Sequence, residues 1–246
     1  MDFIKEFYTV IKELNPNFDL AGFLTKDDNV YPLGTDTKVL STAFELIARP
    51  IIYEIANKYC YKVYEPPEQN YYPDFTLMKS IEDTEKIAID VKTTYRDFRA
   101  DGTWRAKFTL GSYASFMRNG NKNIAFPYSH YKKHYIIGFI YTREEIGDVH
   151  IFKLEDRHKI TYPIKDVEYF CQEKYKIADY TTGSGNTENI GSITASSIDD
   201  FINGNGPFAE LGEDVFNDYW VNFPRYREVG HYRNLDGYKK WKNSLK

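Results

Sequence analysis

The order of helical and strand-like patterns predicts a mixed α+β fold, in which a mixed central β-sheet is flanked by helices. Helical patterns come first, β-rich segments follow, and the chain ends in loops with short helices. No internal repeat and no flexible linker divides the chain. Because 246 residues are enough to bury one large core, we expect a single domain over residues 1–246.

The first elements are a helix, a hairpin and a longer helix. Residues 1–14 place their apolar side chains on one helical face, and residues 19–32 hold two short apolar runs around a polar turn. The longer helix begins after Thr35 or Asp36, either of which can cap it. Pro50 is expected to kink or split that helix, because proline lacks the N–H that an inner helical turn requires.

Six β-rich segments follow, and they supply the strands of the predicted sheet. They share a high content of β-branched and aromatic residues. The segments are residues 61–64, 74–78, 86–95, 134–141, 150–154 and 167–175. Residues 181–198 are rich in Gly, Ser, Thr and Asn and predict a loop, whereas residues 213–221 and 235–243 predict short helices.

The composition excludes several classes of protein. Aromatic residues make up 17% of the chain, which is too many for a disordered protein. Cys60 and Cys171 cannot supply a disulfide framework, so we expect reduced thiols in a cytoplasmic protein. Neither a signal peptide nor a membrane-spanning run is visible, so we expect no membrane partner. His130 and His134 have i, i+4 spacing, but they lack the Glu of a zinc motif and are expected at the surface.

Charge is distributed unevenly along the chain. The formal net charge is −4, yet residues 102–143 contain seven Lys and Arg residues and no acidic residue. Residues 222–246 hold seven basic residues against two acidic ones, so the rest of the chain carries −16. Aromatic and polar residues interleave both basic segments, a composition typical of surfaces that follow nucleic-acid phosphates. Two solvated faces of a soluble protein have the same composition, so charge alone leaves both interpretations open.

Two carboxylates and a lysine are expected to meet at one end of the sheet. Asp74 opens one predicted strand, and Asp90 and Lys92 lie near the end of the next, opposite its apolar face. If residues 79–85 turn the chain back, the strands form a hairpin that brings Asp74 beside Asp90. Neighbouring carboxylates repel each other unless a proton or a cation lies between them, and their oxygens suit Mg²⁺. With a lysine that can orient water, the group suits phosphodiester hydrolysis. The pattern by itself is weak, since exposed Asp–Lys pairs are common.

A longer set of segments carries a resemblance to a known family. The segments are YPLG at 31–34, DTKVLST at 36–42, FEL at 44–46, YPDFTL at 72–77, KIAID at 86–90, KTTY at 92–95, KFTLG at 107–111, KNI at 122–124, IIG at 136–138 and GSGNT at 183–187. By these segments the chain resembles the PD-(D/E)xK nucleases, and among them a type II restriction endonuclease. The resemblance extends from about residue 30 to about residue 220 and implies a restriction-endonuclease-like core.

The resemblance implies catalytic and metal-binding roles for four residues. Asp74 and Asp90 match the metal-binding carboxylates, and Lys92 matches the catalytic lysine. Glu45 matches a further acidic residue on the long helix and is the third metal-binding candidate. Mg²⁺ is the implied cofactor, and no nucleotide cofactor is implied. From the residues alone, Glu45 would be taken as a solvated helical side chain. Lys38 matches a family residue near DNA, although an ordinary lysine in a first helical turn would look the same.

Two polar loops are candidates for DNA contact by the same resemblance. The loop around residues 181–191 matches a major-groove recognition loop, through Gly183, Ser184, Gly185, Asn186 and Thr187. Glycine lets the backbone approach base edges, Asn can pair with adenine, and a Thr methyl can touch thymine. Gln69 and Asn70 match a minor-groove loop, and Thr93, Thr94 and Ser112 are expected phosphate contacts. Flexible surface loops have a similar composition, and Glu188 departs from the family pattern, so the outer base pairs of the site stay open.

Taken together, the resemblance implies a bacterial, cytoplasmic type II site-specific deoxyribonuclease of a restriction–modification system. It would cut both strands of a short palindromic double-stranded DNA site, with GATATC cut bluntly as the leading site, and leave 5′-phosphates. A twofold site implies a homodimer, whose dimerisation element would lie around residues 19–32. Two alternative functions fit the sequence less well. A structure-specific nuclease would need no recognition loop, and a DNA-binding module without activity would not need Asp90 or Lys92.

Overall fold

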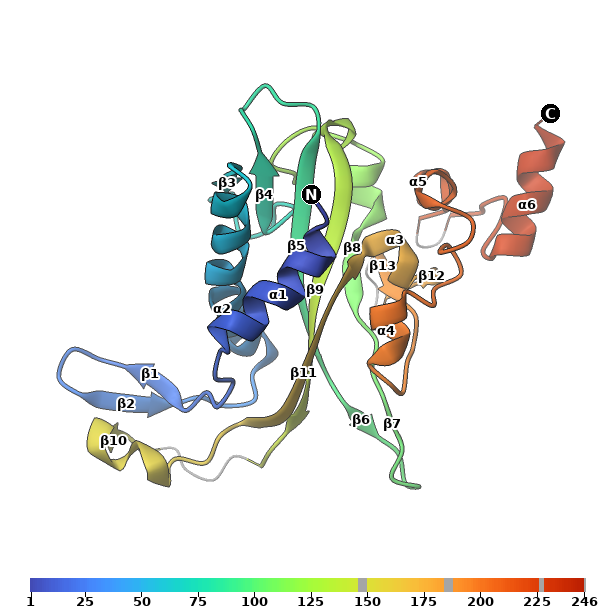
Figure 1. Cartoon of the computed structure of the whole chain (residues 1–246). Coiled ribbons are helices and arrows are strands. Elements are labelled where there is room, and N and C mark those ends of the chain that lie inside the picture. Colours follow the sequence, from blue (N-terminus) through green and yellow to red (C-terminus); the bar gives the residue numbers. More distant parts are fainter. Residues whose placement is uncertain (146–149, 184–187, 226–227, 246) are drawn as a thin grey trace.

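A five-stranded mixed sheet forms the centre of the protein (Figure 1). The computed structural model describes residues 1–145, 150–183, 188–225 and 228–245. In sheet order, the strands are β11 (Ile164–Glu173), β9 (Tyr131–Arg143), β5 (Lys86–Tyr95), β4 (Phe75–Met78) and β3 (Lys62–Tyr64). β5 and β9 are parallel, whereas the other neighbours are antiparallel. The predicted α+β class with a mixed central sheet is therefore confirmed.

Two N-terminal helices cover one face of this sheet. α1 (Phe3–Leu14) and α2 (Thr37–Lys58) pack with the apolar side chains of β5, including Ile89 and Val91, in one buried cluster. The carboxylate of Asp36 caps α2 by accepting hydrogen bonds from the first N–H groups of the helix. α2 runs through Pro50 as one helix, so a split at this residue was a wrong expectation. Pro50 is exposed, where water can hydrate the carbonyl group that it leaves without an N–H donor.

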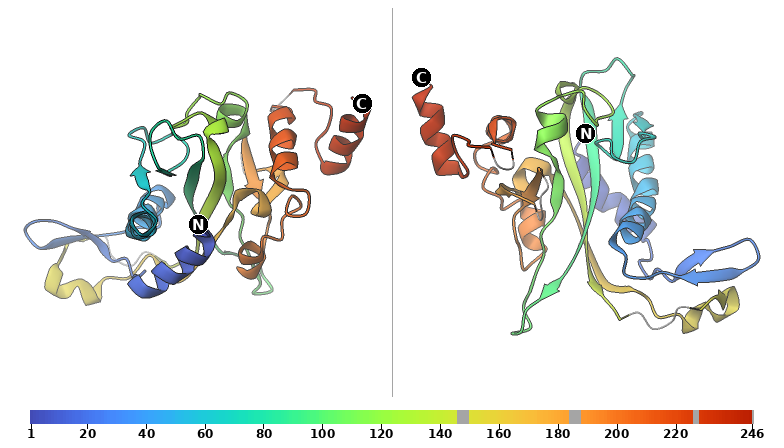
Figure 2. Two further views of the ribbon diagram at one scale, coloured as in Figure 1. Left: turned by 45° about the horizontal axis from the view of Figure 1, so that its top comes forward. Right: turned by 180° about the vertical axis from the view of Figure 1, so that it is seen from behind.

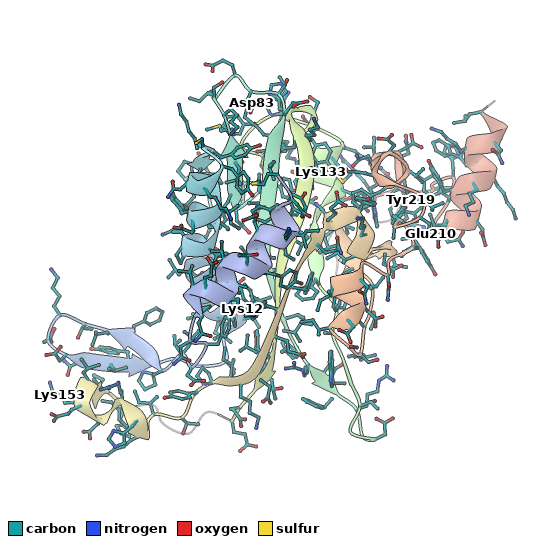
Figure 3. The ribbon with its side chains drawn as sticks, in the orientation of Figure 1. Lys12, Asp83, Lys133, Lys153, Glu210 and Tyr219 are labelled. Carbon is teal, nitrogen blue, oxygen red and sulfur yellow. The ribbon has the colours of Figure 1, made fainter. Side chains whose placement is uncertain are left out.

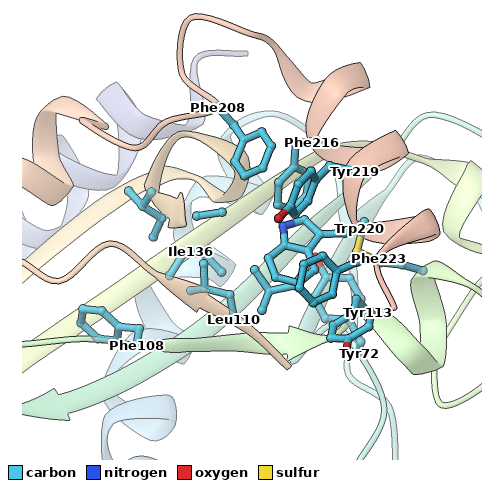
Figure 4. Close-up of a cluster of buried hydrophobic side chains, with 14 of the residues drawn as sticks. Tyr72, Phe108, Leu110, Tyr113, Ile136, Phe208, Phe216, Tyr219, Trp220 and Phe223 are labelled. Carbon is cyan, nitrogen blue, oxygen red and sulfur yellow. The ribbon is translucent and has the colours of Figure 1, made fainter. Parts of the chain in front are cut away.

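Several elements from residue 109 onward, apart from the sheet strands β9 and β11, cover the opposite face. They are β8 (Thr109–Ser112), η1 (Tyr113–Met117), η2 (Tyr128–His130), α3 (Lys174–Ile177), α4 (Asp199–Asn203), α5 (Glu213–Asn222) and α6 (Leu235–Ser244). Ala88 and Ile136 of the sheet share a buried cluster with the aromatic side chains of these elements. Figure 4 shows Trp220 in the middle of this cluster, beside Tyr219 and Phe223. The central sheet therefore has a core on each face.

Three further small sheets complete the fold. β12 (Ala178–Thr182), β13 (Asn189–Ser192) and β8 form one of them. β1 (Gly22–Leu24), β2 (Asn29–Pro32) and β10 (Phe152–Lys153), together with η3 (Leu154–Lys159), form a projection that we call the arm (Figures 1 and 2). β6 (Asp97–Phe98) and β7 (Trp104–Arg105) form a ribbon that follows β5. The arm with Lys153 lies at the opposite end of the molecule from the β4–β5 turn with Asp83 (Figure 3).

Several local expectations differ from the structure. Residues 181–198 are not one loop, because β12 ends at Thr182 and β13 pairs with β8, which lies about 80 residues earlier in the chain. The strand expected at 167–175 ends at Glu173, and the one at 150–154 keeps two residues. His134 was expected at the surface but is buried, and its Nδ1 forms a hydrogen bond of 2.7 Å with the hydroxyl of Tyr72. Cys60 and Cys171 are both free. No helix in the described part of the chain is long and apolar enough to cross a membrane.

Candidate active site

The β4–β5 hairpin brings Asp74, Asp90 and Lys92 together. The residues that follow Asp74 pair with the residues that precede Asp90 in an antiparallel register, as expected from the sequence. The side chains of β5 alternate, so that Ile89 and Val91 enter the core while Asp90 and Lys92 lie on the other face. The hairpin thus places Asp74, directly before β4, and Asp90 of β5 next to a single lysine.

The ammonium of Lys92 lies between the two carboxylates. Its Nζ is 2.7 Å from Oδ2 of Asp90 and 3.9 Å from Oδ2 of Asp74. The side chain of Asp90 is only 4% exposed, whereas those of Asp74 and Lys92 are each 25% exposed. Asp90 therefore forms the inner wall of the site, and Asp74 and Lys92 form the part that solvent or a substrate can reach.

Burial and mutual repulsion shift the protonation of this group. Burial raises the pKa of Asp74 to about 8, and the neighbouring Asp90 and Glu45 carboxylates add to the shift although Lys92 opposes it. Burial lowers the pKa of Lys92, but the attraction of Asp90 and Asp74 outweighs burial and leaves that pKa above its ordinary value. The carboxylates of the site thus carry more negative charge than one lysine neutralises. The raised pKa means that Asp74 keeps its proton near neutral pH.

Glu45 approaches this group from α2. It lines the same groove as Asp74 and Lys92 and is partly buried, whereas its residue type alone indicated a solvated side chain. Burial raises the pKa of Glu45. The charge of Lys92 lowers this pKa and that of Asp90 raises it, so Glu45 interacts electrostatically with both groups. Among the described residues, no three His, Cys, Asp or Glu side chains lie close enough together to hold a metal ion. Glu45 therefore lines the wall of the site and does not complete a three-carboxylate cluster.

The two closest carboxylates fit a magnesium ion. Mg²⁺ is held in many proteins by one or two carboxylates, with water and substrate phosphate oxygens as its other ligands. Asp74 and Asp90 supply two carboxylates, and their repulsion is the kind that a divalent cation relieves. Asp74 and Asp90 are therefore the residues that would hold the ion, with Glu45 adding negative charge nearby.

An open groove with a volume of about 830 Å³ passes over these residues. One wall comes from α2, through Thr37, Ser41 and Glu45, and the other from β6, β7 and the segment before β8. A smaller side hollow of about 320 Å³ shares Asp74 and Lys92 with the groove. Asp74 and Lys92 thus lie where the two open spaces meet, and Asp90 lines the side hollow.

Most of the described candidates for DNA contact surround these spaces. Those that line the groove or the side hollow are Gln69, Asn70, Thr93, Thr94 and Ser112. Lys38 is exposed at the start of α2, directly beside Thr37, which lines the groove. A Cβ added to Gly183 would lie 3.0 Å from Oγ1 of Thr109, another groove residue. Residues 184–187, which include the candidates Ser184, Gly185, Asn186 and Thr187, lie outside the described residues.

Sequence reasoning missed several residues of the groove. Ser41, Tyr141 and Thr194 line it. Tyr141 and Thr194 lie in none of the segments that carry the resemblance, and nothing in the segment at 36–42 singled out Ser41. The basic segment 102–143 gave a partial signal, because Arg105 and Lys107 line the groove. Lys132 and Lys133 of the same segment do not line the groove; they form ion pairs with Glu85 and Glu173 (Figure 3 labels Lys133). Only the folded structure shows which basic residues of this segment line the groove.

The mixed sheet, with two carboxylates and a lysine on its β4–β5 hairpin beside an open groove, places the chain in the restriction-endonuclease class of nucleases. Residues 14–243 match a family model for the restriction endonuclease EcoRV. The chain is also 46% identical over 231 residues to the type II restriction enzyme EcoRV of Escherichia coli, covering 92% of each protein. The chain belongs to the EcoRV family of restriction endonucleases, which confirms the resemblance and the enzyme class expected from the sequence.

A solved structure of the NlaIV restriction endonuclease is a more distant match. It aligns with 98% of this chain and 88% of its own, at 11% identity and a TM-score of 0.39.

Proposed function

We propose that this restriction endonuclease is a Mg²⁺-dependent enzyme that hydrolyses both strands of a short palindromic DNA duplex. The observation that carries the proposal is the position of Lys92 between Asp74 and Asp90, at the meeting point of the groove and the side hollow. The 46% identity to a type II restriction enzyme supports double-stranded DNA as the substrate.

The three residues divide the chemistry between them. Asp74 and Asp90 would hold Mg²⁺, which when bound polarises a phosphoryl group and makes hydroxide available near neutral pH. The ammonium of Lys92 orients the attacking water and offsets the negative charge that develops on the phosphate. The water oxygen forms a bond to phosphorus as the bond from phosphorus to O3′ breaks. One proton goes to O3′, so the products are a 5′-phosphate and a 3′-hydroxyl.

Sequence recognition is assigned to the two polar loops. Gln69 and Asn70 lie at the edge of the site, and Gly183 lies against the groove residue Thr109. The similarity of residues 183–187 to the family's recognition loop favours GATATC, cut bluntly, as the recognised sequence. Such an enzyme would act in the bacterial cytoplasm as the nuclease of a restriction–modification system.

The arm is the proposed dimer contact. A palindromic site with two scissile phosphates needs two active sites related by a twofold axis, hence a homodimer. The arm contains β1 and β2 of the hairpin at 19–32 and exposes three large apolar side chains, with Phe23 and Leu24 each 58% and Tyr31 47% exposed. Ile151, directly before β10, is 52% exposed. Apolar side chains gathered on a projecting element are typical of a protein–protein interface.

Digestion of a sequenced plasmid tests the proposal. Purified protein with Mg²⁺ is expected to give a few discrete fragments whose ends map to one palindrome, with blunt termini and 5′-phosphates. Random nicking would favour a nuclease without sequence specificity. Specific binding without any cleavage would leave only the DNA-binding role, and loss of cutting in EDTA is expected because Asp74 and Asp90 need their ion.

A further inference from the structure

The groove continues past the carboxylates into a distal hollow of about 450 Å³. Arg105 and Thr194 line both spaces, so the distal hollow is a direct continuation of the groove. The other residues of its lining are Arg99, Thr103, Trp104, Ala195 and Ser196. One side is therefore the β6–β7 ribbon, which projects from the end of β5 in Figures 1 and 2, and the other is the segment after β13.

The lining of the distal hollow has the chemistry of a phosphate-binding surface. It combines two guanidinium groups, three hydroxyl groups and an indole, and no carboxylate is among these described lining residues. Two acids of the same ribbon have partners within it. Asp97 forms an ion pair of 2.7 Å with Arg105, and Asp101 accepts hydrogen bonds from Thr103. Guanidinium and hydroxyl donors are the groups that contact DNA phosphates without recognising sequence.

Arg99 is an exposed cation of this surface, whose charge, after the hydrogen bonds from Thr103, helps to lower the pKa of Asp101. Its side chain is exposed, and it forms no ion pair with any residue in the described part of the chain. Its backbone N–H closes the ribbon turn by donating to the carbonyl of Thr103 at 2.8 Å. The guanidinium is therefore available for a ligand, while its backbone is held by the ribbon.

The ribbon is anchored to the body of the protein. Ala106 and Ala195 exchange two backbone hydrogen bonds, of 2.8 and 3.0 Å, which join the ribbon to the segment after β13. Trp104 lies over the guanidinium of the buried Arg96, 5.1 Å from the ring centre. A ligand in the distal hollow would meet a surface that is already in place, so binding would cost little ordering of the chain.

We propose that the β6–β7 ribbon and residues 194–196 bind the phosphate backbone of DNA outside the recognition site. This inference rests on the proposed function, because it needs a duplex in the groove. DNA is a continuous polyanion, with one charge per about 1.7 Å of helix axis, so a strand that passes the carboxylates must go on to meet the next surface along the groove. That surface is the distal hollow, which shares Arg105 and Thr194 with the groove.

Two duplexes that carry the mapped site test this inference. One ends about two base pairs beyond the site on each side, and the other extends about twelve base pairs further. With the wild-type enzyme and Mg²⁺, kcat/KM is expected to be higher on the long duplex. Arg99→Ala should lower kcat/KM on the long duplex about five- to tenfold, leave the short duplex unchanged, and reduce the salt dependence of binding by about one phosphate contact.

Two control variants separate the contact from general effects of charge. Arg99→Lys should keep most of the activity on the long duplex, because it retains a positive charge at the same place. Lys12→Ala removes one positive charge from the last turn of α1 and should change neither duplex. Thermal unfolding of each variant checks that the fold is kept, and its melting temperature should match that of the wild type.

The outcomes distinguish this inference from the proposed function. An equal loss on both duplexes would assign Arg99 to the recognition site itself and overturn the flanking contact. No loss on either duplex, with the wild type still cutting its site, would overturn the flanking contact alone. A wild-type protein that cuts neither duplex would overturn the proposed function and, with it, the inference that depends on it.

Discussion

The backbone N–H of Val91 donates a hydrogen bond of 2.7 Å to Oδ2 of Asp74. Val91 lies between Asp90 and Lys92, so this bond ties the carboxylate of β4 to the strand that carries the other two residues. The geometry of the site thus depends on the register of the β4–β5 hairpin. A slip by one residue would turn the side chains of Asp90 and Lys92 toward the apolar core and take that of Val91 out of it.

Asp90→Ala is expected to abolish cleavage while the protein still folds. The change removes one of the two carboxylates that would hold the ion, so the rate should fall by a factor on the order of 1000. Plasmid cleavage measures the loss, and circular dichroism checks the fold. Glu210→Ala, at an exposed acid in the loop before α5, is the control and should cut normally. An active Asp90→Ala enzyme would mean that the active site lies elsewhere.

Lys92→Met separates catalysis from metal binding. Without its ammonium, the rate should fall at least about 100-fold, because the water and the developing charge on the phosphate lose a partner. Asp74 and Asp90 then face each other without a cation, so Mg²⁺ should raise the melting temperature of the variant more than that of the wild type. Calorimetric melting with and without Mg²⁺ measures this difference. An equal Mg²⁺ effect in both proteins would argue against a shared site.

The raised pKa of Asp74 predicts a pH dependence of stability without metal. The unfolded chain releases this proton near its ordinary pKa of 3.8, whereas the folded chain keeps it up to about 8. The folded state therefore binds the extra proton between these values, and the free energy of unfolding should fall as pH rises through that window. Urea unfolding in EDTA from about pH 5 to about pH 9 tests this. Asp74→Asn should flatten the profile, and an unchanged slope in that variant would contradict the assignment.

Divalent metal is expected to strengthen DNA binding. Glu45, Asp74 and Asp90 place negative charge where a phosphate must lie, and Mg²⁺ neutralises part of it. The Lys92→Met protein, which should cut slowly, allows affinity to be measured by fluorescence anisotropy in Mg²⁺ and in EDTA. We expect at least about tenfold tighter binding with Mg²⁺. Equal affinity in the two buffers would show that these carboxylates do not face the phosphate.

Phe23→Asp should dissociate the proposed dimer. The substitution places a charge on an exposed apolar side chain of the arm, where a partner chain would have to bury it. Light scattering should then give the mass of one chain instead of two, with loss of double-strand cleavage. Ile81→Asp is the matched control, because Ile81 is 65% exposed in the β4–β5 connection, far from the arm. A wild-type monomer, or a dimeric Phe23→Asp protein, would exclude this interface.

The amino-acid sequence by itself determined the features that depend on neighbours in the chain. Helical periodicity and the Asp36 cap predicted α1 and α2, and alternation along β5 put Asp90 and Lys92 on one face. The short connection between β4 and β5 predicted the hairpin that brings Asp74 to them. These signals are local, because caps, periodicity and tight hairpins involve residues close together in the chain. The motif segments extended the prediction to the family.

Tertiary structure alone decided the features that depend on distant pairings. The groove needs α2 on one side and the ribbon on the other, and the distal hollow needs the Ala106–Ala195 pairing. His134 is buried beside its partner Tyr72. The two residues are 62 positions apart in the chain, so no spacing in the sequence could indicate that contact. Nor could a local pattern show that Arg105 lines the groove whereas Lys132, from the same basic segment, does not. Residue type and spacing set which chemistry is possible, and long-range packing sets which side chains share one space.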